Sequence, residues 1–244
     1  MLKNIASILL IFVSFLSSGQ ELDKGTNKNV LLTQDYIVGV NFNTRGWGFV
    51  FDYGKQKHVK YKRTYGVVIS NIRDQKEFKL IGTSGSKGYY YGKINSLVSL
   101  RLTYGGNYLL YKSSRENGIE IQYKWRVGPS FGLVKPVYLE IDKASNGFFN
   151  QISERYDPAI HFPGSINSRS SWFKGLGGAN VQMGAFLKTG FDFNFSAFRT
   201  GISGGEVGVM VDYFPFKKIE IMYQEQELSL FMALYLQFNL GNKF

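Results

Sequence analysis

The residues best suited to catalysis lie in one segment, YDPAIHFPGS at 156–165. His161 follows Asp157 by four residues and precedes Ser165 and Ser168. A serine, a histidine and a carboxylate in contact perform acyl transfer, with the histidine as the base that accepts the serine proton. The same residue types are common in ordinary loops. We favour a loop histidine here and predict that the protein is not an enzyme.

Still fewer residues are candidates for binding a metal ion or a phosphate group. The chain has two histidines and no cysteine, and its Asp and Glu residues form no cluster around either histidine. Zinc sites need several such ligands together. The GLGG sequence at 175–178 neither follows a strand nor opens a helix, as a phosphate-binding loop does. We therefore expect no cofactor and no bound metal.

A larger set of ionisable residues occurs at alternate positions within apolar segments. Its members carry both signs of charge, and they are Asp52, Arg101, Glu120, Lys124, Arg126, Lys188, Asp192, Glu206 and Asp212. A soluble sheet places such residues in water. A small barrel places them in its lumen, where they must pair because a lone buried charge is costly. The mixed signs predict a lumen filled by ion pairs and argue against an open channel of one sign.

The segment GIEIQYKWRVG at 118–128 shows how a strand would position these side chains. Glu120, Gln122, Lys124 and Arg126 alternate strictly with an apolar set, which is Ile119, Ile121, Tyr123, Trp125 and Val127. Alternate residues of a strand point to opposite faces. In a membrane barrel the apolar face meets lipid and the polar face meets the lumen. We assign the two sets in that way.

Many segments share this alternation. We expect strands near 35–44, 46–54, 60–72, 93–104, 107–113, 118–128, 131–141, 180–195, 203–213, 217–224 and 228–240. Several reach ten residues, the length of about 9–11 that a transmembrane strand needs. Aromatic residues cluster near strand ends, as in the girdles at a membrane interface. Because single-chain bacterial barrels have even strand numbers, eleven segments must contain an error.

The two ends of the chain indicate export and membrane assembly. MLKNIASILLIFVSFLSSGQ has one basic residue, a short apolar run and small residues, which is typical of a signal peptide over residues 1–19. In the last segment, LSLFMALYLQFNLGNKF, the residues Leu234, Leu236 and Phe238 face lipid, and Phe244 resembles the assembly signal of outer-membrane barrels. Barrel assembly machinery is then an expected partner.

These observations predict an all-β fold, a transmembrane antiparallel β-barrel of 8–12 strands closed by a C-terminal strand that ends in Phe. We expect a periplasmic lead-in at 20–33 and the barrel at 34–244, with longer, extracellular loops near 73–90 and 142–172. The protein would lie in the outer membrane of a Gram-negative cell.

The chain is basic, with a formal net charge of +11. A cluster of cations, Lys55, Lys57, Lys60, Lys62 and Arg63, surrounds one expected turn. An exported barrel does not meet nucleic acid, so we expect lipopolysaccharide phosphates or other anionic lipid head groups as partners. The alternative is a solvated basic rim without a ligand.

Several motifs carry a family resemblance: YYYGKINSLVSLRLTYG (89–105), GPSFGLVKPVYLE (128–140), FKGLG (173–177), KKIEIM (217–222) and LYLQFNLGNKF (234–244). From about Val59 to the end, the chain resembles small outer-membrane β-barrel proteins of Bacteroidota-type bacteria, whose functions are largely unassigned. The resemblance implies fold and location and no catalytic residues. In size and type the chain is also similar to barrel subunits of the type nine secretion machinery, by analogy only.

Three functions fit these expectations. The first is an accessory or scaffold subunit of an outer-membrane protein assembly, for secretion or barrel insertion, which implies other envelope proteins as partners. The second is a small porin or transport channel. The third is an outer-membrane enzyme acting on lipid, with His161 as its base. We favour the first.

Overall fold

The computed structural model describes residues 33–81, 87–112, 118–145, 148–195, 201–223 and 228–244. The expected signal peptide (1–19) and almost all of the expected lead-in (20–33) lie outside these residues. Among the described residues, no helix is both long enough and apolar enough to cross a membrane.

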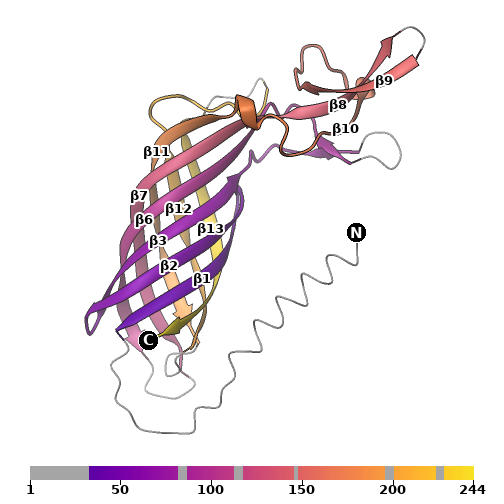
Figure 1. The fold of residues 1–244 in the computed structure, drawn as a ribbon. Helices are drawn as coiled ribbons and strands as arrows, with labels where there is room; N and C mark the ends of the chain where they lie inside the picture. The colour runs from indigo at the N-terminus through magenta and orange to yellow at the C-terminus, as the bar shows by residue number, and fades with distance from the viewer. Residues whose placement is uncertain (1–32, 82–86, 113–117, 146–147, 196–200, 224–227) are drawn as a thin grey trace.

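Eight antiparallel strands form a closed barrel (Figure 1). Around the wall they follow the order β1-β13-β12-β11-β7-β6-β3-β2. Their bounds are β1 Gln34–Asn43, β2 Gly46–His58, β3 Tyr61–Ile72, β6 Asn95–Lys112, β7 Glu120–Pro136, β11 Asn180–Asn194, β12 Gly201–Tyr213 and β13 Leu230–Lys243. The expected all-β barrel with an even strand number is confirmed.

The first and last strands of the wall close the barrel. β1 pairs with β13 from Asp35 opposite Lys243 to Asn43 opposite Tyr235. Beyond β13, the N–H of Phe244 donates to the Gln34 carbonyl at 2.8 Å, and the Gln34 N–H donates to the Phe244 carbonyl at 3.1 Å. The wall therefore has no unpaired edge.

Two of the three surplus expected strands arise because glycine and proline do not always end a strand. The segments expected at 93–104 and 107–113 form the single strand β6, in which Gly105 and Gly106 still pair with β7. The strand β7 likewise continues through Gly128 and Pro129. Both residues pair with β11 there, and the pairs with β6 are interrupted at these two positions. Proline has no N–H to donate, so it fits where a ladder is already interrupted.

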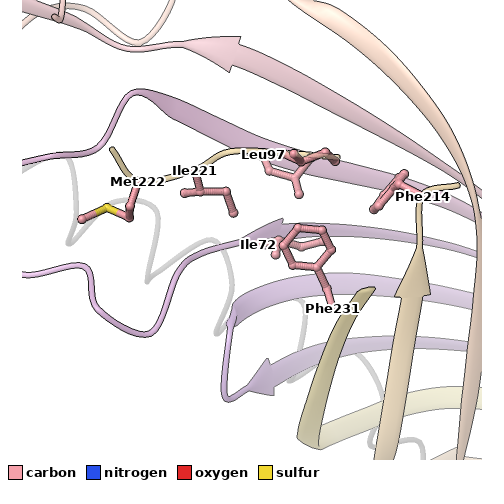
Figure 2. Packing of buried hydrophobic residues seen from close by; sticks show 7 residues of the cluster. Ile72, Leu97, Phe214, Ile221, Met222 and Phe231 are labelled. Carbon is pink, nitrogen blue, oxygen red and sulfur yellow. The ribbon is translucent and has the colours of Figure 1, made fainter. Parts of the chain in front are cut away.

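The expected strand at 217–224 is also wrong, because this segment enters the barrel mouth instead of its wall. Ile219, Ile221 and Met222 join a buried apolar cluster with inward-facing wall residues, namely Ile72, Leu97, Phe214 and Phe231 (Figure 2). The Ile221 carbonyl accepts the Ile94 N–H at 3.0 Å, which holds the segment against the start of β6. We call this cluster the apolar cap.

The two ends of the barrel differ in the length of their connections. One end carries the connections 73–94, 137–179 and 214–229 and the short turn between β1 and β2, and we call it the loop end. The opposite end holds Gln34, Phe244 and the turn between β2 and β3, and we call it the terminal end (Figure 1). The turn at the loop end requires Gly46, whose φ of 144° disfavours other residues.

A second unit of sheet stands at the loop end, where the sequence predicted long polar loops. β8 (Tyr138–Ser145), β9 (Phe148–Arg155) and β10 (Ile166–Arg169) form a three-stranded sheet. The short strands β4 (Lys79–Leu80) and β5 (Tyr89–Tyr90) pair beside it. Its buried core consists of Tyr89, Leu139, Ile141, Tyr156 and Ile166. We call these five strands, with the residues that connect β9 to β10, the loop-end module. The 3-10 turn Pro163–Ser165 lies in that connection, and the 3-10 turn Leu176–Gly178 lies between β10 and β11.

Candidate functional site

The histidine expected as a possible base does not meet a nucleophile. His161 is buried, and its Nδ1 accepts the backbone N–H of Asp157 at 3.0 Å. Its Nε2 lies 3.6 Å from a carboxylate oxygen of Glu154. Ser165 donates to the Phe162 carbonyl at 2.9 Å, and Ser168 donates to Glu140 at 2.6 Å. The three residue types are therefore not assembled as a catalytic triad.

No metal centre is apparent within the described ranges. They contain no group of three or more His, Cys, Asp or Glu side chains that could hold an ion. The GLGG sequence forms a 3-10 turn at Leu176–Gly178 between the loop-end module and β11. It precedes a strand, so it lacks the helix N-terminus that binds phosphate.

The nine charged residues assigned to the lumen are all buried within the barrel, each with 6% or less of its surface exposed. At the centre, Lys124 Nζ lies 2.9 Å from Asp192 and 3.2 Å from Glu206. Lys188 Nζ lies 2.8 Å from the other oxygen of Glu206, and Tyr235 donates to that same oxygen at 2.7 Å. These five side chains come from β7, β11, β12 and β13, so they tie one half of the wall together.

Two arginines make further pairs across the lumen. Arg101 donates to both oxygens of Asp212, at 2.9 and 2.7 Å, and its guanidinium lies 4.6 Å from the centre of the Phe186 ring. Arg126 donates to Asp52 at 3.1 Å. The fit is tight, because a Cβ added at Gly66 would lie 2.0 Å from an Asp52 oxygen. The last of the nine, Glu120, accepts a short hydrogen bond from Gln122.

Sequence reasoning missed the neutral residues that complete this network. Gln237 accepts from Lys188 at 2.6 Å, and Asn239 donates to Asp192 at 2.9 Å. Tyr235, Gln237 and Asn239 occupy the inward face of β13, opposite the residues assigned to lipid. The alternation in the last strand could have predicted these three inward positions, because a residue between two outward-facing residues of a strand points inward.

The residues assigned to lipid lie on the outer surface of the wall. Leu234, Leu236 and Phe238 are exposed by 62, 47 and 55%. Ile119 and Val127 are also exposed, and the remaining three, Ile121, Tyr123 and Trp125, are partly exposed. The structure shows their orientation, and contact with lipid stays a prediction.

The two features expected to meet partners both lie at the terminal end. Phe244 is 54% exposed, and its ring centre lies 6.2 Å from that of Tyr36. In the basic cluster, Lys62 pairs with Asp35, and the Arg63 guanidinium lies 5.8 Å from the centre of the Tyr104 ring. Lys55, Lys57 and Lys60 are exposed. The cluster is therefore on the end opposite the long connections.

Comparisons with known proteins identify no family. No protein-family model and no curated protein matches the chain. Among solved structures, Ail, the attachment invasion locus protein of Yersinia pestis, aligns with a TM-score of 0.40 at 10% identity over 87% of this chain and 99% of its own. Neisserial surface protein A aligns with a TM-score of 0.38 at 8% identity, over 87% and 95% of the two chains. The N-terminal barrel domain of Pseudomonas aeruginosa OprF gives 0.37 and 8%, over 87% and 97%. At these scores the similarities carry no argument about function.

Proposed function

We propose that this protein is a non-enzymatic barrel of the outer membrane that serves as an accessory or scaffold subunit of a larger protein assembly. The observation that carries the proposal is the distribution of polarity in the barrel. Its outside is apolar, its inside is filled by paired charges and an apolar cap, and a folded module projects from one end.

The outer wall supports the membrane location. The outward residues of β13 form an unbroken apolar row from Leu230 to Leu240. Similar rows cover the other strands, and soluble monomers rarely expose continuous apolar patches of more than a few hundred Å². The barrel strands have 10 to 18 residues, and about 9–11 suffice to cross the hydrocarbon core. A bilayer would cover this surface without any change in the fold.

The interior supports a scaffold role over a channel. An eight-stranded barrel has room only for side chains or one small ligand. Here Arg101–Asp212, Arg126–Asp52 and the pairs around Glu206 occupy that space, and the apolar cap closes the loop end above them. A solute would have to break several buried ion pairs to pass.

The loop-end module supplies a surface for a partner. It has its own buried core, and it presents exposed apolar side chains, including Ile160 at 67% and Phe162 at 68%. Other envelope proteins are the partners that such a surface fits best, and barrel assembly machinery is expected to act during insertion.

Native purification tests this function. We would insert an affinity tag at the turn of β2 and β3, where Val59 is 88% exposed and far from the loop-end module, and leave Phe244 unchanged. Outer membranes would be solubilised in mild detergent. We expect envelope proteins to co-purify in fixed ratio with the tagged chain.

The matched control removes the three-stranded sheet of the loop-end module, β8 to β10, and keeps the barrel. A short Gly-Ser linker would replace 139–169, because the Ser170 N–H already lies 3.1 Å from the Tyr138 carbonyl and the two ends meet there. Loss of the partners from this variant, with normal recovery of the barrel, supports docking on the module. Recovery of the intact chain without any partner would contradict the subunit role.

A further inference from the structure

A groove of about 1000 Å³ separates the loop-end module from the outer wall of the barrel. Its floor is the outer surface of β2, β3 and β6 near the loop end, and its roof and rim come from β8, β10 and the connections beside them. The lining thus joins the barrel wall to the loop-end module.

The floor of the groove is apolar. Trp47, Phe49 and Ile69 point outward from β2 and β3 and are exposed by 43, 53 and 50%. The Trp47 and Phe49 rings meet edge to face, with centres 5.4 Å apart. Val98 of β6 continues this surface. An acyl chain could lie along it and bury apolar area on both sides.

The rim of the groove is cationic. Five of its residues carry positive side chains, Arg73, Lys87, Lys93, Lys135 and Arg169, and Glu140 is the one carboxylate among the lining residues. Glu140 already accepts a hydrogen bond from Ser168, and Lys93 already pairs with Glu77 at 2.6 Å. The remaining cations give the groove a net positive charge.

Lys135 is the strongest sign of an anionic ligand. It points outward from β7 but is only 5% exposed, because the connection after β10 covers it. Its Nζ donates to the backbone carbonyls of Lys174 at 3.2 Å and Pro136 at 3.4 Å, and it lies 5.4 Å from the centre of the Trp172 ring. No carboxylate of the described chain pairs with it. A buried cation without an anion is unfavourable, and a bound anion would compensate it.

We propose that this groove binds a phosphorylated lipid, with its phosphate at Lys135, Lys87 and Arg169 and an acyl chain against Phe49, Ile69 and Val98. The proposal rests on the membrane location proposed above, which places the groove at the boundary between hydrocarbon and water at the loop end. An apolar floor directly below a cationic rim fits an anionic amphiphile better than a soluble anion, because a soluble anion uses only the rim.

Intrinsic fluorescence can measure this binding, because Trp47 and Trp172 line the groove and the chain has three tryptophans in all. The full-length protein in detergent would be titrated with lipid A and, separately, with dephosphorylated lipid A that keeps the same acyl chains. We expect the phosphorylated form to bind about tenfold more tightly or better, since a charge-assisted contact carries at least that much.

Variants then separate the two parts of the site. The double variant Lys135→Gln with Arg169→Gln should lower the affinity for lipid A about tenfold or more. Lys217→Gln with Lys218→Gln removes the same charge from exposed positions outside the groove lining and should leave the affinity for lipid A unchanged. Ile69→Gln should lower the affinity for lipid A, because it alters the apolar floor. It should leave any fluorescence change caused by inorganic phosphate as it is in the wild type. Circular dichroism and thermal unfolding of each variant report whether the fold is intact.

Three results would overturn the proposal. These are equal affinity for the two forms of lipid A, equal loss of affinity in the rim variant and in the Lys217 and Lys218 control, and inorganic phosphate that binds as tightly as lipid A. Cell fractionation distinguishes this failure from failure of the membrane location. If the wild-type chain is found in the outer membrane and the lipid results are negative, only the groove assignment is wrong.

Discussion

At the scale of single residues, Arg101 shows how a charged side chain becomes interior structure. It is 1% exposed, binds Asp212 through two hydrogen bonds and lies over the Phe186 ring. Ser130 donates to the same carboxylate at 2.9 Å. The charges of Arg101 and Asp212 therefore compensate each other, and removing either side chain leaves the other buried without its counter-charge.

Removing one member of this pair should destabilise the barrel strongly. We expect Arg101→Ala to lower the free energy of unfolding by about 3–5 kcal/mol, because Asp212 is left buried without its cation. Arg101→Met with Asp212→Leu should recover most of that loss, since apolar residues often replace a buried pair without cost. Urea unfolding in detergent micelles measures both. A loss below about 1 kcal/mol in the single variant, as expected for exposed Lys55→Ala, would contradict the pairing.

The inward direction of these residues was predictable, whereas their partners were not. Alternation within one segment is enough to place Arg101 and Asp212 on the polar face of their strands. Their pairing depends on strand order and register, because they are 111 residues apart and lie on β6 and β12, which are not neighbours in the wall. Similarly, the buried state of His161 depends on the module around it, which the sequence did not reveal.

At the scale of elements, β7 carries the two-faced pattern in its clearest form. Tyr123 faces outward, accepts a hydrogen bond from Thr189 at 2.8 Å and lies beside Phe191. Gln122, the preceding residue, faces the lumen beside Glu120. The same substitution at positions 122 and 123 therefore compares the lumen with the outer surface of the barrel.

Tyr123→Arg should impair membrane assembly more than Gln122→Arg. A charge on the lipid face near the bilayer centre costs about 2–4 kcal/mol, whereas an arginine at position 122 can pair with Glu120. The measurement is the fraction of each variant that reaches the outer membrane in folded form. Equal fractions for the two variants would count against the assignment of faces.

The loop-end module should respond to alkaline pH independently of the barrel. Burial raises the pKa of Tyr156 and of Tyr89 above the ordinary value of 10. Tyr156 is surrounded by Gly92, whose N–H donates to its oxygen at 3.1 Å, and by the rings of Tyr91 and His161. A raised pKa means that the folded module favours the protonated phenol, so this stability is complete below pH 10 and is lost as the pH rises through the raised value.

Proteolysis of the module as a function of pH tests this expectation, with tyrosinate absorbance recorded in parallel. Wild-type protein should become susceptible above pH 10, and Tyr156→Phe should resist to higher pH because one titrating group is absent. Identical profiles for the two proteins would show that Tyr156 does not control the opening.

The wall strands were easier to predict than the module because they are long and alternate without interruption. The errors in the wall fell at Gly105, Gly128 and Pro129, where local turn preferences are outweighed by pairing with a neighbouring strand. In β8 and β10 the apolar residues are few, and only Leu139, Ile141 and Ile166 enter the core. Their contacts with Tyr89 and Tyr156 come from distant segments, so a single-sequence pattern does not show them.

At the scale of the whole molecule, the barrel has an interior filled by side chains and an apolar outer surface. The apolar cap fills the loop end, and layers of paired charges and the buried group Phe186, Met210, Ala233 and Tyr235 fill the interior below it. We therefore expect no steady ionic conductance when the protein is reconstituted in a planar bilayer. Discrete, long-lived open states of the wild-type protein would contradict a scaffold role and favour a small channel.

The pairing of β1 with β13 has a further consequence, for the order of events during folding. β1 gains its second neighbour only when β13, about two hundred residues further along the chain, comes to lie beside it. Until then the partly formed wall has two open edges, and each edge can pair with a neighbouring chain. A chain that lacks β13 would therefore leave β1 and β12 as unpaired edges and would not form a smaller closed barrel.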